Sequence, residues 1–154
     1  GFSTYTPEEV DFLLNNFDFD VIQVPFNILD KRLIRSGMFD KLANQDVEVH
    51  ARSIFLQGML LASKENRPAS FSRWSKHFMM WEKWLSENNI TPIQACIDFV
   101  CSFDMIDKIV VGVDEFEQFK KLGQLFSNSG NMVPPTELMN NDENLIDPRS
   151  WGRI

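Results

Sequence analysis

The sequence has few cysteines and no cluster of basic residues. Its cysteines, Cys96 and Cys101, lie five residues apart in a segment of helical character, which suits neither a metal site nor a disulfide framework. We therefore expect a reducing, cytoplasmic location. The 22 acidic residues outnumber the 15 basic ones, giving a net charge of −7. Because phosphate neutralisation requires grouped Lys and Arg, nucleic acid is not expected as a partner.

Long apolar runs and the common phosphate-binding fingerprints are also missing. No stretch approaches the roughly 20 apolar residues of a membrane-spanning helix, so we expect no membrane partner. The sequence contains no G-x-G-x-x-G, no G-x-x-x-x-G-K-[S/T] and no H-E-x-x-H, and we expect no metal cofactor. The chain opens with GFSTYTPEE rather than Met, which predicts a processed protein or a fragment of a longer one.

Three segments carry the pattern of a helix start. Thr6–Glu9 combines a capping hydroxyl, a proline at the first helical position and a glutamate that can reach back to the cap. Thr91-Pro92 repeats this pattern, and Asp114-Glu115 repeats it without the proline. We expect a helix after each, and two more near residues 37–43 and 71–86.

Short strand-like runs alternate with these helices, at residues 1–3, 20–26, 47–53 and 108–113. Regular alternation of strand and helix is typical of parallel βα units. The sequence therefore predicts an α/β domain over residues 1–126. Residues 127–154 are rich in Asn, Ser and Pro and are predicted to form an extended C-terminal tail with one short helical turn.

The run at residues 47–53, VEVHARS, carries apolar side chains on one face and Glu48, His50 and Arg52 on the other. A sheet covered by helices on both faces would be nearly all apolar. The polar face therefore favours the interior of a barrel over an open sheet. His50 beside Glu48 is interpreted as a structural pair rather than a general base.

Gln23 lies between Ile22 and Val24 in an otherwise apolar strand. A buried amide without a partner costs about 1–3 kcal/mol. Gln23 must therefore find a hydrogen-bonding group, either inside the barrel or on a bound ligand.

Four segments together resemble consecutive βα units of the aldo-keto reductases: GFSTYTPEE, FDVIQVPFNILDKR, VEVHARSIFLQGMLL and IDKIVVGVDEFEQF. The resemblance covers about residues 1–126. It implies the C-terminal half, strands five to eight, of that family's TIM (β/α)8 barrel, completed by a missing N-terminal half or a partner chain. The FLQG variant resembles a bacterial subgroup associated with surface-sugar biosynthesis.

The resemblance also implies a cofactor, NAD(P)H, and the residues that bind it. Gln23, Ser3 and Thr4 match positions that bind the nicotinamide carboxamide, with Thr4 replacing an asparagine. Arg52 takes the place of the aromatic residue that stacks on the nicotinamide. Because a guanidinium disfavours a cationic ring beside it, Arg52 is expected to favour the reduced cofactor. The positions matched to the pyrophosphate are Ser53, Phe55 and Gln57, and those matched to the adenosine end are Gly112, Val113, Asp114 and Gln118.

The adenosine positions indicate a preference between the two cofactors. Relatives that prefer NADPH carry Lys or Arg for its 2′-phosphate, whereas this sequence has Asp114 and Glu115. Acidic side chains repel a phosphate, so we expect NADH over NADPH. Leu122 replaces an asparagine that commonly binds the adenine.

Each of these residues also has a purely structural interpretation. Gln23 can be paired within the barrel, Arg52 can neutralise Glu48, and Gly112 can be a simple turn. The positions acquire a common function only through the resemblance.

Two functions remain open. Catalysis in the family depends on Asp, Tyr, Lys and His from the first half of the barrel, so we assign no catalytic residue in this chain. According to the first of these two functions, the chain is the nicotinamide-binding part of an oxidoreductase that reduces a small carbonyl compound. Sugar derivatives are candidate substrates. In the second, it is a stand-alone, non-catalytic half-barrel for binding or assembly, whose open strand edges promote self-association.

Overall fold

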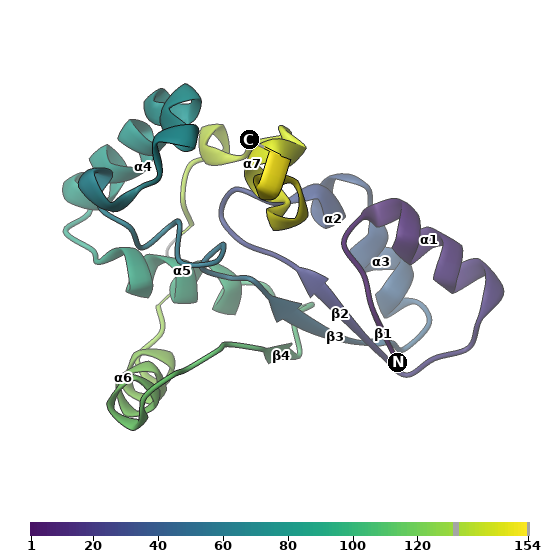
Figure 1. Ribbon diagram of the computed structural model, residues 1–154. Helices are drawn as coiled ribbons and strands as arrows, with labels where there is room; N and C mark the ends of the chain where they lie inside the picture. The colour runs from purple at the N-terminus through teal and green to yellow at the C-terminus, as the bar shows by residue number, and fades with distance from the viewer. Residues whose placement is uncertain (131–132, 154) are drawn as a thin grey trace.

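The computed structural model describes residues 1–130 and 133–153. Four strands form one parallel sheet in the order β1-β2-β3-β4 (Figure 1). The pairing of β2 with β3 spans five positions, whereas β1 and β4 each pair over two. The predicted α/β class with a parallel sheet is confirmed. The strands are β1 (Phe2–Ser3), β2 (Val21–Pro25), β3 (Glu48–Arg52) and β4 (Lys108–Ile109).

Helices connect the strands. In Figure 1, α1 and α3 lie at one end of the sheet and α5 and α6 at the other. Two 3-10 turns, η1 (Lys64–Asn66) and η2 (Ala69–Trp74), precede α4. The helices are α1 (Pro7–Asn16), α2 (Arg32–Arg35), α3 (Met38–Ala43), α4 (Ser75–Glu87), α5 (Pro92–Cys101) and α6 (Phe116–Ser127).

The predicted helix caps hold at two of three positions. The Glu9 N–H donates to Thr6 Oγ1 at 3.2 Å, and the Glu9 carboxylate accepts from the Thr6 N–H at 3.3 Å. The Thr91 hydroxyl accepts from the backbone at the start of α5. At α6 the prediction is wrong, because the capping position is Glu115 and its side chain makes no capping bond.

The core lies between the helices and one face of the sheet. Ile22, Val24 and Ala51 point toward the helices and are completely buried. Phe26, at the end of β2, stacks on Phe99 of α5 with ring centroids 5.3 Å apart. Burial of these apolar surfaces is the main stabilising contribution to the fold.

The opposite face of the sheet is polar and partly exposed. Ser3, Gln23, His50 and Lys108 lie in register across the four strands. His50 Nε2 lies 2.6 Å from the Glu48 carboxylate, as the sequence predicted. Within the described residues, helices therefore bury only one face of the sheet, as expected of a barrel segment.

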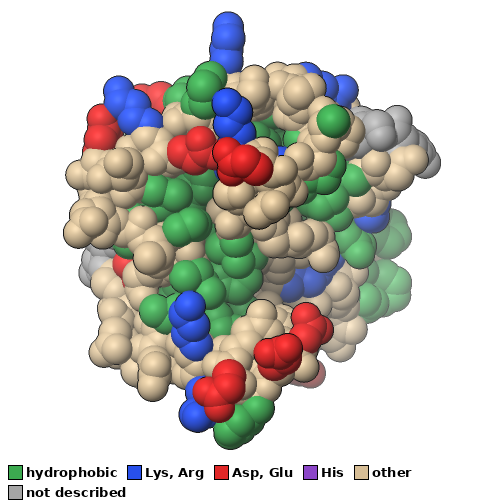
Figure 2. Space-filling view, turned by 60° about the vertical axis from the view of Figure 1, so that its left-hand side comes forward, with side chains coloured by type: hydrophobic (Ala, Val, Ile, Leu, Met, Phe, Trp, Pro, Cys, Tyr) green, Lys and Arg blue, Asp and Glu red, His purple; other side chains and the backbone are tan. Residues whose placement is uncertain are grey.

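Large apolar side chains are exposed beside both edge strands. Phe2 and Phe12 lie at the β1 edge, and Phe116 and Phe119 of α6 follow β4, each more than a third exposed. Figure 2 shows hydrophobic side chains gathered over the middle of one face, with charged side chains around them.

The C-terminal segment is more folded than the predicted extended tail. It forms η3 (Thr136–Leu138), α7 (Glu143–Ile146) and η4 (Pro148–Arg153). Leu138, Leu145 and Ile146 are buried against the rest of the chain. Trp151 packs edge-on against Phe71, with the ring centroids 5.0 Å apart. These contacts hold the segment in place, and residues 131, 132 and 154 of the predicted tail lie outside the described residues.

Candidate functional site

A cavity of about 540 Å³ opens where β3 and β4 end. The loop at residues 53–61 forms one wall, and residues 110–118 form the other. Carboxyl ends of parallel strands are the usual location of ligand sites in barrels of this type. Seven of the eleven predicted binding residues line this cavity: Arg52, Ser53, Phe55, Gln57, Gly112, Asp114 and Gln118.

The loop after β3 has an unusual backbone. Leu56, Gln57 and Gly58 are consecutive residues with positive φ, at 47°, 52° and 80°, and Ser53 has φ 57°. This left-handed region is costly for residues other than glycine. The buried Asn27 supports the loop, because its side-chain amide donates to the Ser53 carbonyl at 3.2 Å.

This backbone leaves several amide groups without a partner. The N–H groups of Leu56 and Met59 donate to loop carbonyls at 2.9 Å. By contrast, the backbone N–H groups of Ile54, Phe55, Gln57 and Gly58 donate to no group in the described part of the chain. All four residues line the cavity. Backbone N–H groups that lie close together and lack a partner in the chain can bind an anion.

Arg52 lies beside this loop. Its guanidinium donates to the Thr4 carbonyl at 2.9 Å and to Ser53 Oγ at 3.4 Å, and it lies over the Tyr5 ring at 4.2 Å. Among residues 1–130 and 133–153, no carboxylate lies within 4.0 Å of it. The charge of Arg52 is therefore available to an anionic ligand.

The alternative in which Arg52 neutralises Glu48 is wrong. Glu48 instead accepts from Lys108 Nζ at 2.5 Å and pairs with His50 at 2.6 Å. Hydrogen bonds from Lys108, and secondly from His50, hold the pKa of Glu48 below its usual value. This cluster satisfies its own charges and is separate from the cavity.

On the second wall, Asp114 is exposed and precedes α6. Its N–H donates to the Gln118 side chain at 2.9 Å, which fixes the two residues relative to each other. The Asp114 carboxylate therefore adds negative charge to this end of the cavity. Val113 lies between two lining residues but is itself outside the lining.

Ser3, Thr4 and Gln23 lie on the sheet rather than in the cavity lining. Gln23 is only partly buried, so the premise of a fully buried amide is wrong. Its position on the uncovered face leaves it open to a ligand, with Ser3 beside it in register. Thr4 is 3 % exposed, and its hydroxyl has no partner in the described chain. Thr4 adjoins the cavity through its carbonyl, which accepts from Arg52.

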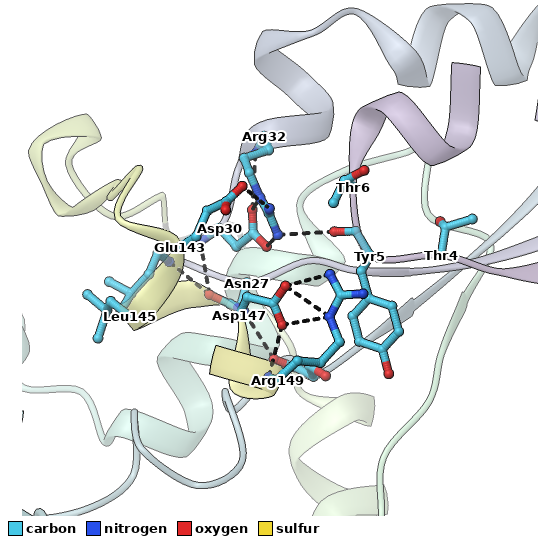
Figure 3. A network of polar contacts seen from close by, with 12 residues as sticks. Thr4, Tyr5, Thr6, Asn27, Asp30, Arg32, Glu143, Leu145, Asp147 and Arg149 are labelled. Atoms are coloured by element: carbon cyan, nitrogen blue, oxygen red, sulfur yellow. Dashed lines mark hydrogen bonds and ion pairs between the residues drawn. The ribbon is translucent and has the colours of Figure 1, made fainter. Parts of the chain in front are cut away.

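Figure 3 shows a polar network near Tyr5 that sequence reasoning missed. Arg149, in η4, binds Asp147 through both carboxylate oxygens, and its guanidinium lies 3.8 Å from the Tyr5 ring centroid. Arg32 donates to the Tyr5 carbonyl at 3.1 Å and pairs with Asp30 at 2.8 Å. No sequence pattern links Tyr5 with Arg149, because they come from opposite ends of the chain.

Two further kinds of site are not found among the described residues. No group of three or more His, Cys, Asp or Glu side chains within residues 1–130 and 133–153 could hold a metal ion. In the same part of the chain, every helix is too short or too polar to cross a membrane.

The sequence matches the profile of the Aldo/keto reductase family over residues 1–129. The fold is similar to an aldo-keto reductase from Bacillus halodurans. Its holo form has a TM-score of 0.67 at 18% identity, covering 90% of this chain and 47% of the reductase. Its apo form has a TM-score of 0.64 at 18% identity, covering 88% and 46%. The chain thus spans about half the length of these structures. No curated protein matches it.

Proposed function

The chain belongs to the aldo/keto reductase family, and we propose that it is the nicotinamide-binding half of an oxidoreductase that reduces a carbonyl compound. Its parallel α/β fold is that of part of a TIM barrel. When bound, the cofactor supplies the hydride, and the residues of this chain hold and orient it.

One observation carries the proposal. Four unpaired backbone N–H groups, at Ile54, Phe55, Gln57 and Gly58, line one cavity together with an arginine that has no acidic partner in the described chain. This donor set suits the pyrophosphate of a dinucleotide, which carries two negative charges and many acceptor oxygens. The residues present therefore fit the cofactor that the family implies.

The remaining residues then have complementary roles. Gln23 and Ser3, in register on the uncovered sheet face, bind the carboxamide of the nicotinamide ring. Arg52 lies beside that ring and favours its neutral, reduced form, because a guanidinium repels the cationic oxidised ring. The carboxylate of Asp114 repels a 2′-phosphate, so NADH is preferred over NADPH.

Catalytic residues come from outside this chain. We propose that an N-terminal half-barrel supplies them and covers the polar sheet face between the open edges of β1 and β4. The exposed aromatic side chains beside both edges, such as Phe12 and Phe119, support this. The substrate is a small carbonyl compound, and the FLQG segment favours a sugar derivative.

A titration of the full-length protein with NADH and NADPH tests the proposal. We expect saturable quenching of tryptophan fluorescence, stronger with NADH, and no aldehyde reduction by the isolated 154-residue chain. Absence of binding by either cofactor contradicts the proposal.

A second candidate is a non-catalytic half-barrel that self-associates, and the exposed strand edges favour it. Sedimentation equilibrium of the isolated chain separates the two. A stable dimer that binds no cofactor supports the second candidate.

A further inference from the structure

The ring of Tyr5 contacts two guanidinium groups. Arg52, at the end of β3, lies 4.2 Å from the ring centroid, and Arg149, in η4, lies 3.8 Å from it. Figure 3 shows the Arg149 side chain beside the Tyr5 ring. Stacking of a guanidinium on an aromatic face is favourable, but two like charges near one ring repel each other. This arrangement therefore requires that other groups hold both arginines.

Arg149 is held firmly by its own segment. Its guanidinium donates to Asp147 Oδ1 at 3.0 Å and to Oδ2 at 2.6 Å, and lies 3.8 Å from Glu9 of α1. Asp147 is buried, and its hydrogen bonds with Arg149 keep the pKa of that carboxyl below its usual value. The orientation of Arg149 is therefore set by the C-terminal segment, which lies beyond the residues 1–129 that match the family.

Arg52 is held much less firmly. No carboxylate lies within 4.0 Å of it in the described part of the chain, and its contact with Ser53 Oγ, at 3.4 Å, is long. Its remaining contacts are the Thr4 carbonyl, at 2.9 Å, and the Tyr5 ring. The contact with the Tyr5 ring therefore contributes much of the restraint on the orientation of the Arg52 guanidinium at the cavity.

We propose that Arg149 and Tyr5 are positioning residues for Arg52. The C-terminal segment fixes Arg149, Arg149 fixes the Tyr5 ring, and the ring fixes the Arg52 guanidinium against the cavity. The effect on cofactor affinity rests on the proposed function, whereas the effect on the position of Arg52 does not.

The test measures NADH affinity of the full-length protein by fluorescence titration. Arg149→Gln is expected to weaken binding about threefold, the size of an exposed cation–π contact. Arg149→Lys, which keeps the charge, is expected to restore part of the loss. The matched control is Arg73→Gln, because Arg73 makes the same kind of contact with Trp74, at 3.9 Å, away from the cavity. This control is expected to bind NADH like wild type.

Two Tyr5 variants test whether Arg149 acts on Arg52 through the Tyr5 ring. Tyr5→Phe keeps the ring and is expected to bind NADH like wild type, whereas Tyr5→Leu is expected to resemble Arg149→Gln. The double variant Tyr5→Leu/Arg149→Gln is expected to bind no more weakly than Tyr5→Leu alone. Additive losses, or unchanged affinity in Arg149→Gln, overturn the proposal. Thermal unfolding establishes that each variant is folded.

An NMR measurement without cofactor separates this proposal from the proposed function. The Arg52 Nε–Hε signal is expected to move in Arg149→Gln, which leaves the Tyr5 ring in place, and to stay in Arg73→Gln. An unmoved signal in Arg149→Gln overturns the positioning role, even when NADH binds. A moved signal in a protein that binds no cofactor supports the positioning role and contradicts the proposed function.

Discussion

Asn27 and Ser53 join the loops that follow β2 and β3. The Asn27 side-chain amide donates to the Ser53 carbonyl at 3.2 Å, and its Oδ1 accepts from the N–H groups of Leu29 and Asp30 at 3.0 Å. Asn27 is completely buried. One side chain therefore braces both loops at the carboxyl ends of the strands, including the strained loop that lines the cavity.

Removal of this brace is expected to destabilise the protein. Asn27→Ala leaves buried backbone groups without partners, at a cost of about 1–3 kcal/mol in the free energy of unfolding. Urea denaturation measures the change. Asn27→Asp retains the acceptor and loses the donor to Ser53, so its comparison with wild type isolates the contact with the loop. A midpoint for Asn27→Ala equal to wild type contradicts the bracing role.

The positive φ of Gly58 predicts that an alanine substitution there lowers the stability of the protein. No atom lies within 4 Å of a Cβ added at Gly58, so Gly58→Ala meets no steric obstacle there, but its φ of +80° is strained for alanine. We expect a loss of about 1 kcal/mol in the free energy of unfolding. Gly123→Ala is the control, because Gly123 has equally open space but lies within α6. Alanine is the better helix former, so this control is expected to be more stable than wild type.

The pairing of Asp147 with Arg149 predicts a pH dependence. Hydrogen bonds from Arg149 lower the pKa of Asp147 in the folded state. This stabilisation is therefore present above the unfolded pKa, near 4, and is lost as the pH falls through the lowered folded value. Urea unfolding of wild type and Asp147→Asn is expected to differ at pH 7 and to converge at low pH. An equal difference at both pH values contradicts the assignment.

Cofactor preference depends on Asp114. Asp114→Ser removes the charge that repels a 2′-phosphate, and we expect the ratio of NADPH to NADH affinity to rise about tenfold or less, since the carboxylate is exposed and screened. Fluorescence titrations with both cofactors measure the ratio. Glu137→Ser, an exposed acid away from the cavity, is the control. An unchanged ratio in Asp114→Ser removes the basis for the NADH preference.

Much of the fold could be predicted from local sequence. Alternation in VEVHARS correctly indicated a sheet with one buried and one polar face, and the Thr6 pattern gave a helix start that the structure confirms. These features depend on neighbouring residues alone. The cap predicted at Asp114 was wrong because the capping position lies one residue later, at Glu115, whose side chain makes no capping bond.

The other features of the fold and of the site depend on long-range packing, which local sequence does not predict. The C-terminal segment was predicted to be extended because its composition is polar, yet three buried apolar side chains hold it against the body. The cavity brought seven predicted residues together, but these had been selected by a family resemblance. The contacts of Tyr5 with Arg52 and Arg149 join three distant parts of the chain, and periodicity carries no information about them.

The central claim is that the backbone N–H groups of the loop after β3 bind the pyrophosphate of a nicotinamide cofactor. An amide NMR titration of the full-length protein with NADH tests it most directly. We expect the signals of Ile54, Phe55, Gln57 and Gly58 to shift together and to saturate at one dissociation constant. If NADH binds and these four signals stay in place, or if no signal moves, the claim is contradicted.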